Sequence, residues 1–112
     1  AMSAEAARLG GVLLPGFDGH AVGRSLHAPP RLPNHPDVLA MFPPVRLTPG
    51  MVVTVEPVVA PAGSDCVRDG WADRTADGSD ACFTEATVLV GPPRPGRPGS
   101  AVLAGFPDGW FA

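Results

Sequence analysis

The sequence predicts an α+β fold, built mainly from antiparallel β-sheet with one or two short helices. Apolar, β-branched runs, of which residues 51–59 are the clearest, alternate with short Gly- or Pro-containing turns. Helix signals are confined to residues 3–9 and 36–41. Gly and Pro number 14 and 15 of 112 residues, but 45% of the chain is hydrophobic and only 17% charged. Such a composition favours a folded core with many loops over disorder.

The N-terminal part predicts a short helix, a strand and a proline-rich excursion. The helix spans 3–9, with Ser3 as N-cap and Gly10 as its end. A strand over 11–14 is then broken by Pro15 and Gly16. Residues 28–49 contain seven prolines, which remove too many backbone donors for a central strand or a long helix. This stretch is therefore expected on the surface, with one helix at 36–41 that has Pro in its first turn.

The C-terminal part predicts the main sheet. After the strand at 51–59, a strand is expected at 66–75, a turn at 76–79 and a third strand at 81–90. Residues 92–99 read as a polyproline-like spacer, and 101–106 as a last edge strand.

The two cysteines are expected to be free thiols. A hairpin that turns near Asp77 and Gly78 would place Ala72 opposite Cys82 and leave Cys66 well away. With no export signal visible, two cysteines do not indicate a disulfide framework.

Length and charge narrow the classes of function. We expect one domain over 1–112, divided into a helical segment at 1–10, a core at 11–91 and a spacer with an edge segment at 92–112. No apolar run is long enough to span a membrane and no signal peptide is visible, so the expected location is cytoplasmic. A net charge of −3, with eight basic residues that are all arginine, argues against a nucleic-acid partner. The residue bias is typical of a GC-rich bacterial genome.

Two of the three glutamates, Glu56 and Glu85, lie within the most apolar strands. A bare buried carboxylate costs several kcal/mol unless a cation or strong donors compensate it. Either these side chains reach solvent on the wet face of a sheet, or they converge with a histidine on a divalent metal. His20, between two glycines, is the available histidine, and His27 follows seven residues later.

Four motifs in order resemble the C-terminal half of the methionine aminopeptidases, in metallopeptidase family M24. They are Gly19-His20-Ala21-Val22-Gly23-Arg24-Ser25-Leu26-His27-Ala28-Pro29-Pro30, Thr48-Pro49-Gly50-Met51-Val52-Val53-Thr54-Val55-Glu56-Pro57, Asp69-Gly70-Trp71 and Asp77-Gly78-Ser79. The resemblance implies one half of a pita-bread fold, in which two pseudo-symmetric halves surround a two-metal site. It also implies removal of an N-terminal methionine by metal-activated water, and a naturally truncated chain.

The resemblance implies roles for individual residues. His20, Glu56 and Glu85 match metal ligands; the Glu56 position also acts in proton transfer, and the Glu85 position bridges the two metals. His27 matches a catalytic histidine that hydrogen-bonds the substrate. Trp71 matches an aromatic residue near the specificity pocket, for which we also expect Phe83.

The chain also departs from the family pattern. Two aspartate ligands and a further histidine come from an N-terminal half that is absent from this sequence, and the usual Phe-Glu-His is replaced by Thr84-Glu85-Ala86. We therefore expect one divalent ion (Mn, Fe, Co or Zn) and a repurposed metal-dependent enzyme with little or no aminopeptidase activity. The alternatives are a metal-free protein that binds a small molecule or peptide, and one subunit of a split aminopeptidase. The expected partner is a second copy or a separate N-terminal-half subunit, because a bare sheet face favours association.

Overall fold

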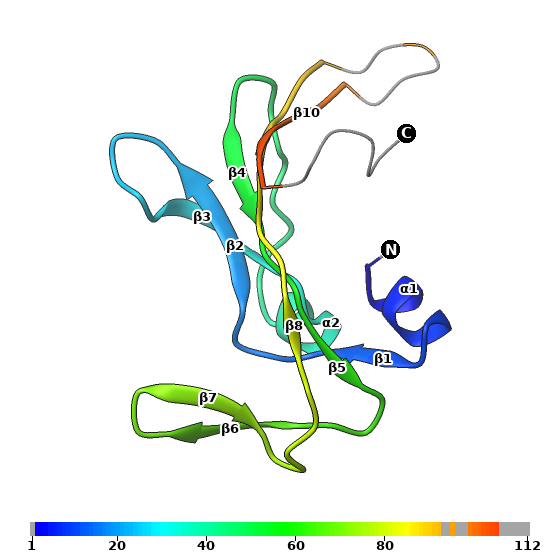
Figure 1. Ribbon diagram of the computed structural model, residues 1–112. Helices are drawn as coiled ribbons and strands as arrows, with labels where there is room; N and C mark the ends of the chain where they lie inside the picture. The colour runs from blue at the N-terminus through cyan, green and yellow to red at the C-terminus, as the bar shows by residue number, and fades with distance from the viewer. Residues whose placement is uncertain (1, 93–94, 96–98, 106–112) are drawn as a thin grey trace.

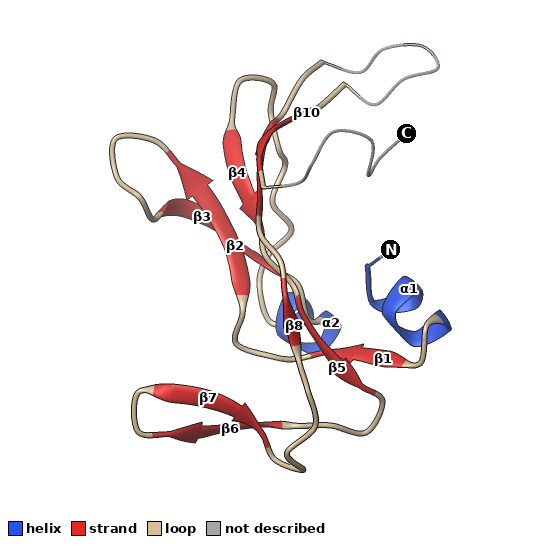
Figure 2. Ribbon diagram, in the orientation of Figure 1, coloured by secondary structure: helices blue, strands red, loops and turns tan. Residues whose placement is uncertain are grey.

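The computed structural model describes residues 2–92, 95 and 99–105. Within these residues, two short helices and ten strands follow one another (Figures 1 and 2). They are α1 (Met2–Arg8), β1 (Gly11–Leu13), β2 (Asp18–Val22), β3 (Ala28–Pro33), α2 (Pro36–Ala40), β4 (Val52–Val55), β5 (Val58–Pro61), β6 (Cys66–Asp69), β7 (Ala72–Thr75), β8 (Cys82–Phe83), β9 (Ala86–Leu89) and β10 (Ala101–Ala104).

The strands form three sheets in which every pairing is antiparallel. The largest has the order β10-β9-β4-β2-β3, the second β1-β5-β8, and the third is the β6-β7 hairpin. Figure 2 shows how little helix accompanies these strands. The predicted α+β class with mainly antiparallel sheet is confirmed.

Both helix spans are confirmed within a residue or two, but Ser3 lies inside α1 and is not its N-cap. Helix α1 is followed by Gly10, whose φ of 77° suits glycine and ends the helix. Helix α2 begins after His35, whose Nδ1 accepts a hydrogen bond from the backbone N–H of Asp37. That bond caps one of the free N–H groups at the start of the helix.

The strand predicted at 51–59 is instead two strands in different sheets. The chain leaves the five-stranded sheet after Val55 and enters the three-stranded sheet at Val58. Pro57 causes part of this break, because it lacks the N–H that a continuous ladder would need. The partner strand breaks at the same level, between β8 and β9, so the segment 81–90 is also divided.

The segment predicted as one strand at 66–75 is a hairpin of its own. It turns at Gly70 and Trp71, where Gly70 has a φ of 62°, and not near Asp77. Consequently Cys66 pairs with Thr75 and Cys82 pairs with Val59. The predicted opposition of Cys82 and Ala72 is wrong, although both thiols are free.

The proline-rich segment contains one strand that the sequence did not reveal. Strand β3 is at the edge of the five-stranded sheet, where a missing N–H does not interrupt a ladder on both sides. Its neighbour β2, which carries His20, was not expected either. The predicted edge strand at the C-terminal end is confirmed as β10, whereas the polyproline-like spacer at 92–99 lies largely outside the described residues.

The core of the described residues is small. Its buried apolar side chains are Ala6, Leu13, Leu14, Ala21, Val53, Val58, Ala60 and Ala86, and no large side chain among the described residues is fully enclosed. Many large apolar side chains are exposed instead, among them Leu9, Leu26, Met41, Trp71, Phe83 and Leu103. No helix in the described part of the chain is long and apolar enough to cross a membrane.

Candidate metal site

The pairing of β2 with β4 brings His20 and Glu56 together. Ala21 is paired with Val53 and Val22 with Val52, so continuing the same register sets His20 opposite Thr54. Glu56 follows two residues later and, by the period of two in a strand, lies on the same face as Thr54. His20 Nε2 is 3.4 Å from Glu56 Oε1, and the two side chains are 13% and 19% exposed.

Gly19 allows this close approach of the two strands. A Cβ atom at Gly19 would overlap the backbone oxygen of Thr54 and lie 3.1 Å from its carbonyl carbon. Only glycine fits between the strands here, which explains why a glycine precedes His20.

One hydrogen bond orients the imidazole of His20. Its Nδ1 is 3.0 Å from the backbone oxygen of Ala21, which can only accept, so Nδ1 carries a proton. In the neutral ring this leaves the lone pair of Nε2 facing the Glu56 carboxylate. Histidine ligands of metal ions usually donate a hydrogen bond from one ring nitrogen to a carbonyl or carboxylate and bind the metal through the other ring nitrogen.

The spacing of the pair suits two neighbouring ligands of one ion. Metal–nitrogen and metal–oxygen bonds near 2.1 Å at a tetrahedral angle separate the two ligand atoms by about 3.4 Å. The observed 3.4 Å between Nε2 and Oε1 matches that value. The donor set, one imidazole and one carboxylate, also suits Mn²⁺, Fe²⁺, Co²⁺ or Zn²⁺.

In the part of the chain that the structure describes, no third protein ligand joins the pair. Within residues 2–92, 95 and 99–105, no three His, Cys, Asp or Glu side chains lie close enough together to hold a metal ion. Glu85 lies between β8 and β9 and is exposed, as in the alternative in which this carboxylate reaches solvent. The chain leaves one sheet for the other at this residue, which keeps its side chain out of the core.

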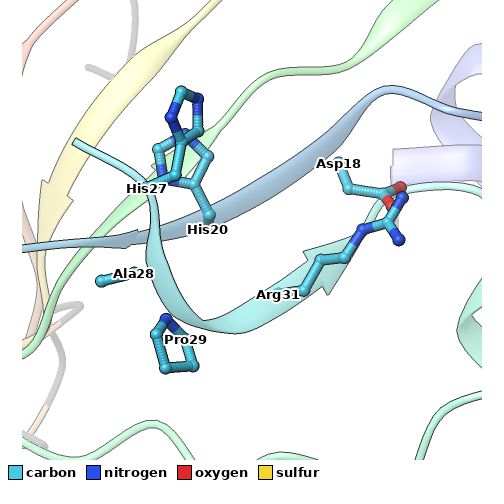
Figure 3. Close-up of a pocket in the computed structure, with 6 residues that line it drawn as sticks. All are labelled: Asp18, His20, His27, Ala28, Pro29 and Arg31. Carbon is cyan, nitrogen blue, oxygen red and sulfur yellow. The ribbon is translucent and has the colours of Figure 1, made fainter. Parts of the chain in front are cut away.

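His27 stands beside His20. It belongs to the loop between β2 and β3, and its ring centroid is 4.4 Å from that of His20, with 49° between the ring planes. A pocket of about 380 Å³ opens there, lined by Asp18, His20, His27, Ala28, Pro29 and Arg31. Figure 3 shows the two imidazoles at one end of the pocket and the Asp18–Arg31 pair at the other.

Asp18 and Arg31 are pocket residues that the sequence analysis missed. The carboxylate of Asp18 is 3% exposed, and its Oδ2 is 2.5 Å from Nη2 of Arg31. Within the described residues this ion pair compensates the buried charge, and neither carboxylate oxygen accepts a hydrogen bond of regular geometry. The available sequence signal for this pair was Asp18 itself, a charged residue directly before the motif that begins at Gly19.

The two aromatic residues expected at a substrate pocket lie elsewhere. Trp71 is at the tip of the β6-β7 hairpin and 93% exposed, and Phe83 in β8 is 56% exposed. Neither lines the pocket beside His20 and His27. Their role in binding a substrate stays a prediction.

Comparison with known proteins relates this arrangement to one family. The model of metallopeptidase family M24 matches residues 3–92. The methionine aminopeptidase of Treponema pallidum is 47% identical over 77 residues, and methionine aminopeptidase 1 of Bacillus subtilis is 38% identical over 80 residues. Each match covers 66% of this chain and 29% of the relative, so the chain spans less than a third of the length of these relatives.

Solved structures show the same fold. The methionine aminopeptidase of Thermotoga maritima is similar with a TM-score of 0.67 and 29% identity, over 90% of this chain and 38% of that one. The enzyme of Rickettsia prowazekii has a TM-score of 0.70 at 24% identity, over 90% of this chain and 39% of that one, which shows a shared fold. The predicted resemblance, including part of a pita-bread fold, is confirmed. The chain belongs to metallopeptidase family M24.

Proposed function

We propose that this chain is a metal-binding half-domain of the methionine aminopeptidase type, in which His20 and Glu56, with Glu85, bind one divalent ion. The observation that carries the proposal is the His20–Glu56 pair, with 3.4 Å between Nε2 and Oε1 and with the imidazole oriented by the carbonyl of Ala21. A ring held in this way presents a lone pair, and the adjacent carboxylate supplies the charge that a cation needs.

The half-domain would have little or no aminopeptidase activity by itself. The described residues bring together two of the three proposed ligands, and the chain corresponds to only 29% of the length of the curated relatives. Ligands beyond His20, Glu56 and Glu85 would come from a partner, either a second copy or a separate N-terminal-half subunit. The small core and the exposed large apolar side chains support such a partner.

A bound divalent ion would polarise a carbonyl group or lower the pKa of water. Glu56 is placed to accept a proton, because its carboxylate is half-buried beside the imidazole of His20. His27 is exposed at the pocket and can hydrogen-bond a ligand there. We expect this ligand to be a small molecule or peptide. The cytoplasmic location expected from the sequence stays a prediction.

Titration with Co²⁺, followed by absorption spectroscopy and calorimetry, tests metal binding. We expect one ion per chain, and at least about tenfold weaker binding by Glu56→Gln and His20→Ala. Glu5→Gln is the matched control, because Glu5 pairs with Arg8 on the exposed face of α1. Wild-type protein that binds no metal under saturating conditions, or Glu56→Gln with unchanged affinity, would contradict the proposal. Glu85→Gln in the same series tests the third ligand.

The absence of a three-residue group among residues 2–92, 95 and 99–105 favours a second candidate, a metal-free protein that binds a ligand in the pocket beside His27. Binding of a methionyl peptide that is equal with and without chelator supports this candidate. Light scattering of the purified protein tests the partner, since a stable monomer argues against association. Methionyl-peptide hydrolysis by the isolated chain is expected to be at or near background.

A further inference from the structure

Among the described residues, Thr54 is the only polar residue that is buried as a whole, with 3% of its surface exposed. It lies on β4, the central strand of the five-stranded sheet. A buried hydroxyl group destabilises the fold unless its hydrogen bonds are made, so its partners in this position matter.

Both partners of the Thr54 hydroxyl belong to the proposed metal site. Oγ1 accepts a hydrogen bond of 2.9 Å from the backbone N–H of His20, and the O–H group donates one of 2.7 Å to Oε1 of Glu56. The backbone oxygen of His20 is a longer alternative acceptor at 3.4 Å. Because one hydroxyl has one proton, the shorter bond to the charged carboxylate is the stronger.

The hydroxyl continues the connection between β2 and β4 where the backbone pairing ends. The last paired residues on this side are Ala21 and Val53, and one step further the N–H of His20 meets the side chain of Thr54 and not its backbone. One oxygen atom thus links the backbone of one proposed ligand to the carboxylate of the other.

We propose that Thr54 is a positioning residue that sets the spacing of His20 and Glu56. This inference rests on the proposed function for its metal readout, but the hydrogen bonds themselves can be tested in the metal-free protein. Valine at this position keeps the shape and removes both hydrogen bonds, whereas serine keeps the hydroxyl. A role in packing alone would be satisfied by valine.

The experiment compares Thr54→Val, Thr54→Ser and Thr87→Val. Thr87 is the control because it is the partner of Thr54 on β9, in the same sheet, and no side-chain hydrogen bond joins it to His20 or Glu56. The two readouts are the Co²⁺ dissociation constant and the hydrogen-exchange rate of the His20 amide without metal. For Thr54→Val we expect binding about tenfold weaker and exchange about fivefold faster. Thr54→Ser and Thr87→Val should stay near wild type.

The outcomes distinguish failure of the positioning role of Thr54 from failure of the proposed metal binding. If Thr54→Val keeps wild-type metal affinity and wild-type exchange at the His20 amide, the positioning role is overturned. If wild-type protein binds no metal, the proposed function fails, and the amide exchange alone decides the role of Thr54. If Thr54→Val does not fold, the exchange of the Thr54 hydroxyl proton with water is measured by NMR in wild type and in Glu56→Ala. Slow exchange in wild type and fast exchange in Glu56→Ala support the role, and equal rates overturn it.

Discussion

Replacing Gly19 by alanine puts a methyl group into the gap between β2 and β4. The new Cβ would overlap the backbone oxygen of Thr54 and lie 3.1 Å from its carbonyl carbon. Ordinary carbon–carbon contacts are about 3.5–4.0 Å, so this contact alone requires the strands to separate by about 0.5–1 Å, and the closer overlap with the oxygen requires at least as much. The obstacle is backbone in a central strand, which cannot rotate away as a side chain can.

The cost follows from this shift. Overpacking of this kind destabilises by about 1–3 kcal/mol, and loss of the 2.9 Å hydrogen bond from the His20 N–H to Thr54 adds about 1 kcal/mol. A total of about 2–4 kcal/mol corresponds to a fall in Tm of about 10–20 °C for a chain of this size. Because His20 moves with β2, affinity for Co²⁺ should fall as well.

Thermal unfolding monitored by circular dichroism measures the effect, with Gly23→Ala as the matched control. A Cβ at Gly23 meets no atom within 4 Å, and its φ lies outside the left-handed region. Alanine there should be neutral or stabilise by up to about 1 kcal/mol. A Gly19→Ala protein that melts within about 2 °C of wild type, or equal losses at the two glycines, would refute the close approach.

Three further predictions concern other charged and reactive groups. Arg31→Met should destabilise the fold by about 1–3 kcal/mol, because it leaves the 3%-exposed Asp18 carboxylate without its cation. In chemical denaturation, the double variant Asp18→Asn/Arg31→Met should recover part of this loss of stability. Additive losses from the two substitutions would argue against coupling of the two side chains. Burial raises the pKa of the Cys66 thiol, with a smaller contribution from a nearby aspartate. Alkylation of Cys66 should therefore be slower than alkylation of the exposed Cys82, and should accelerate only at higher pH. Equal alkylation rates of the two cysteines at pH 8 would contradict this prediction. Hydrogen bonds from the Ser79 hydroxyl and amide lower the pKa of Asp77, so its contribution to stability is present above the ordinary aspartate pKa and is lost as pH falls through the lowered value. Carboxyl NMR titration of Ser79→Ala should show this pKa shifted back upward, and an unchanged value would remove the assigned cause.

Much of the fold followed from local signals. The prolines and glycines marked the two helices and several turns, and the valine-rich run marked the strongest strand. Strands β2 and β3 were not predicted, because their stability comes from pairing with β4 and with each other and not from local propensity. The sequence also did not predict the strand breaks near Glu56 and Glu85. A run of apolar residues has the same pattern whether the strand stays in one sheet or crosses to another.

The candidate site was only partly accessible from the residues. The sequence predicted a metal site of His20, Glu56 and Glu85, and the structure sets the first two side chains 3.4 Å apart. For Glu85 the sequence left solvent exposure and metal binding open, and the structure shows the residue exposed at the crossing between two sheets. Asp18 and Arg31 lie thirteen residues apart in the chain and meet only through the β2-β3 pairing.

By itself, the sequence determined the α+β class, the family resemblance and the types of side chain available for chemistry, because composition, spacing and motifs are properties of the chain alone. Tertiary structure decided which of those side chains meet. Strand register set His20 opposite Thr54, the glycine at position 19 let the strands approach, and the buried hydroxyl joined histidine to glutamate. These contacts depend on pairing between residues more than thirty positions apart, and no local pattern encodes the register of such a pairing.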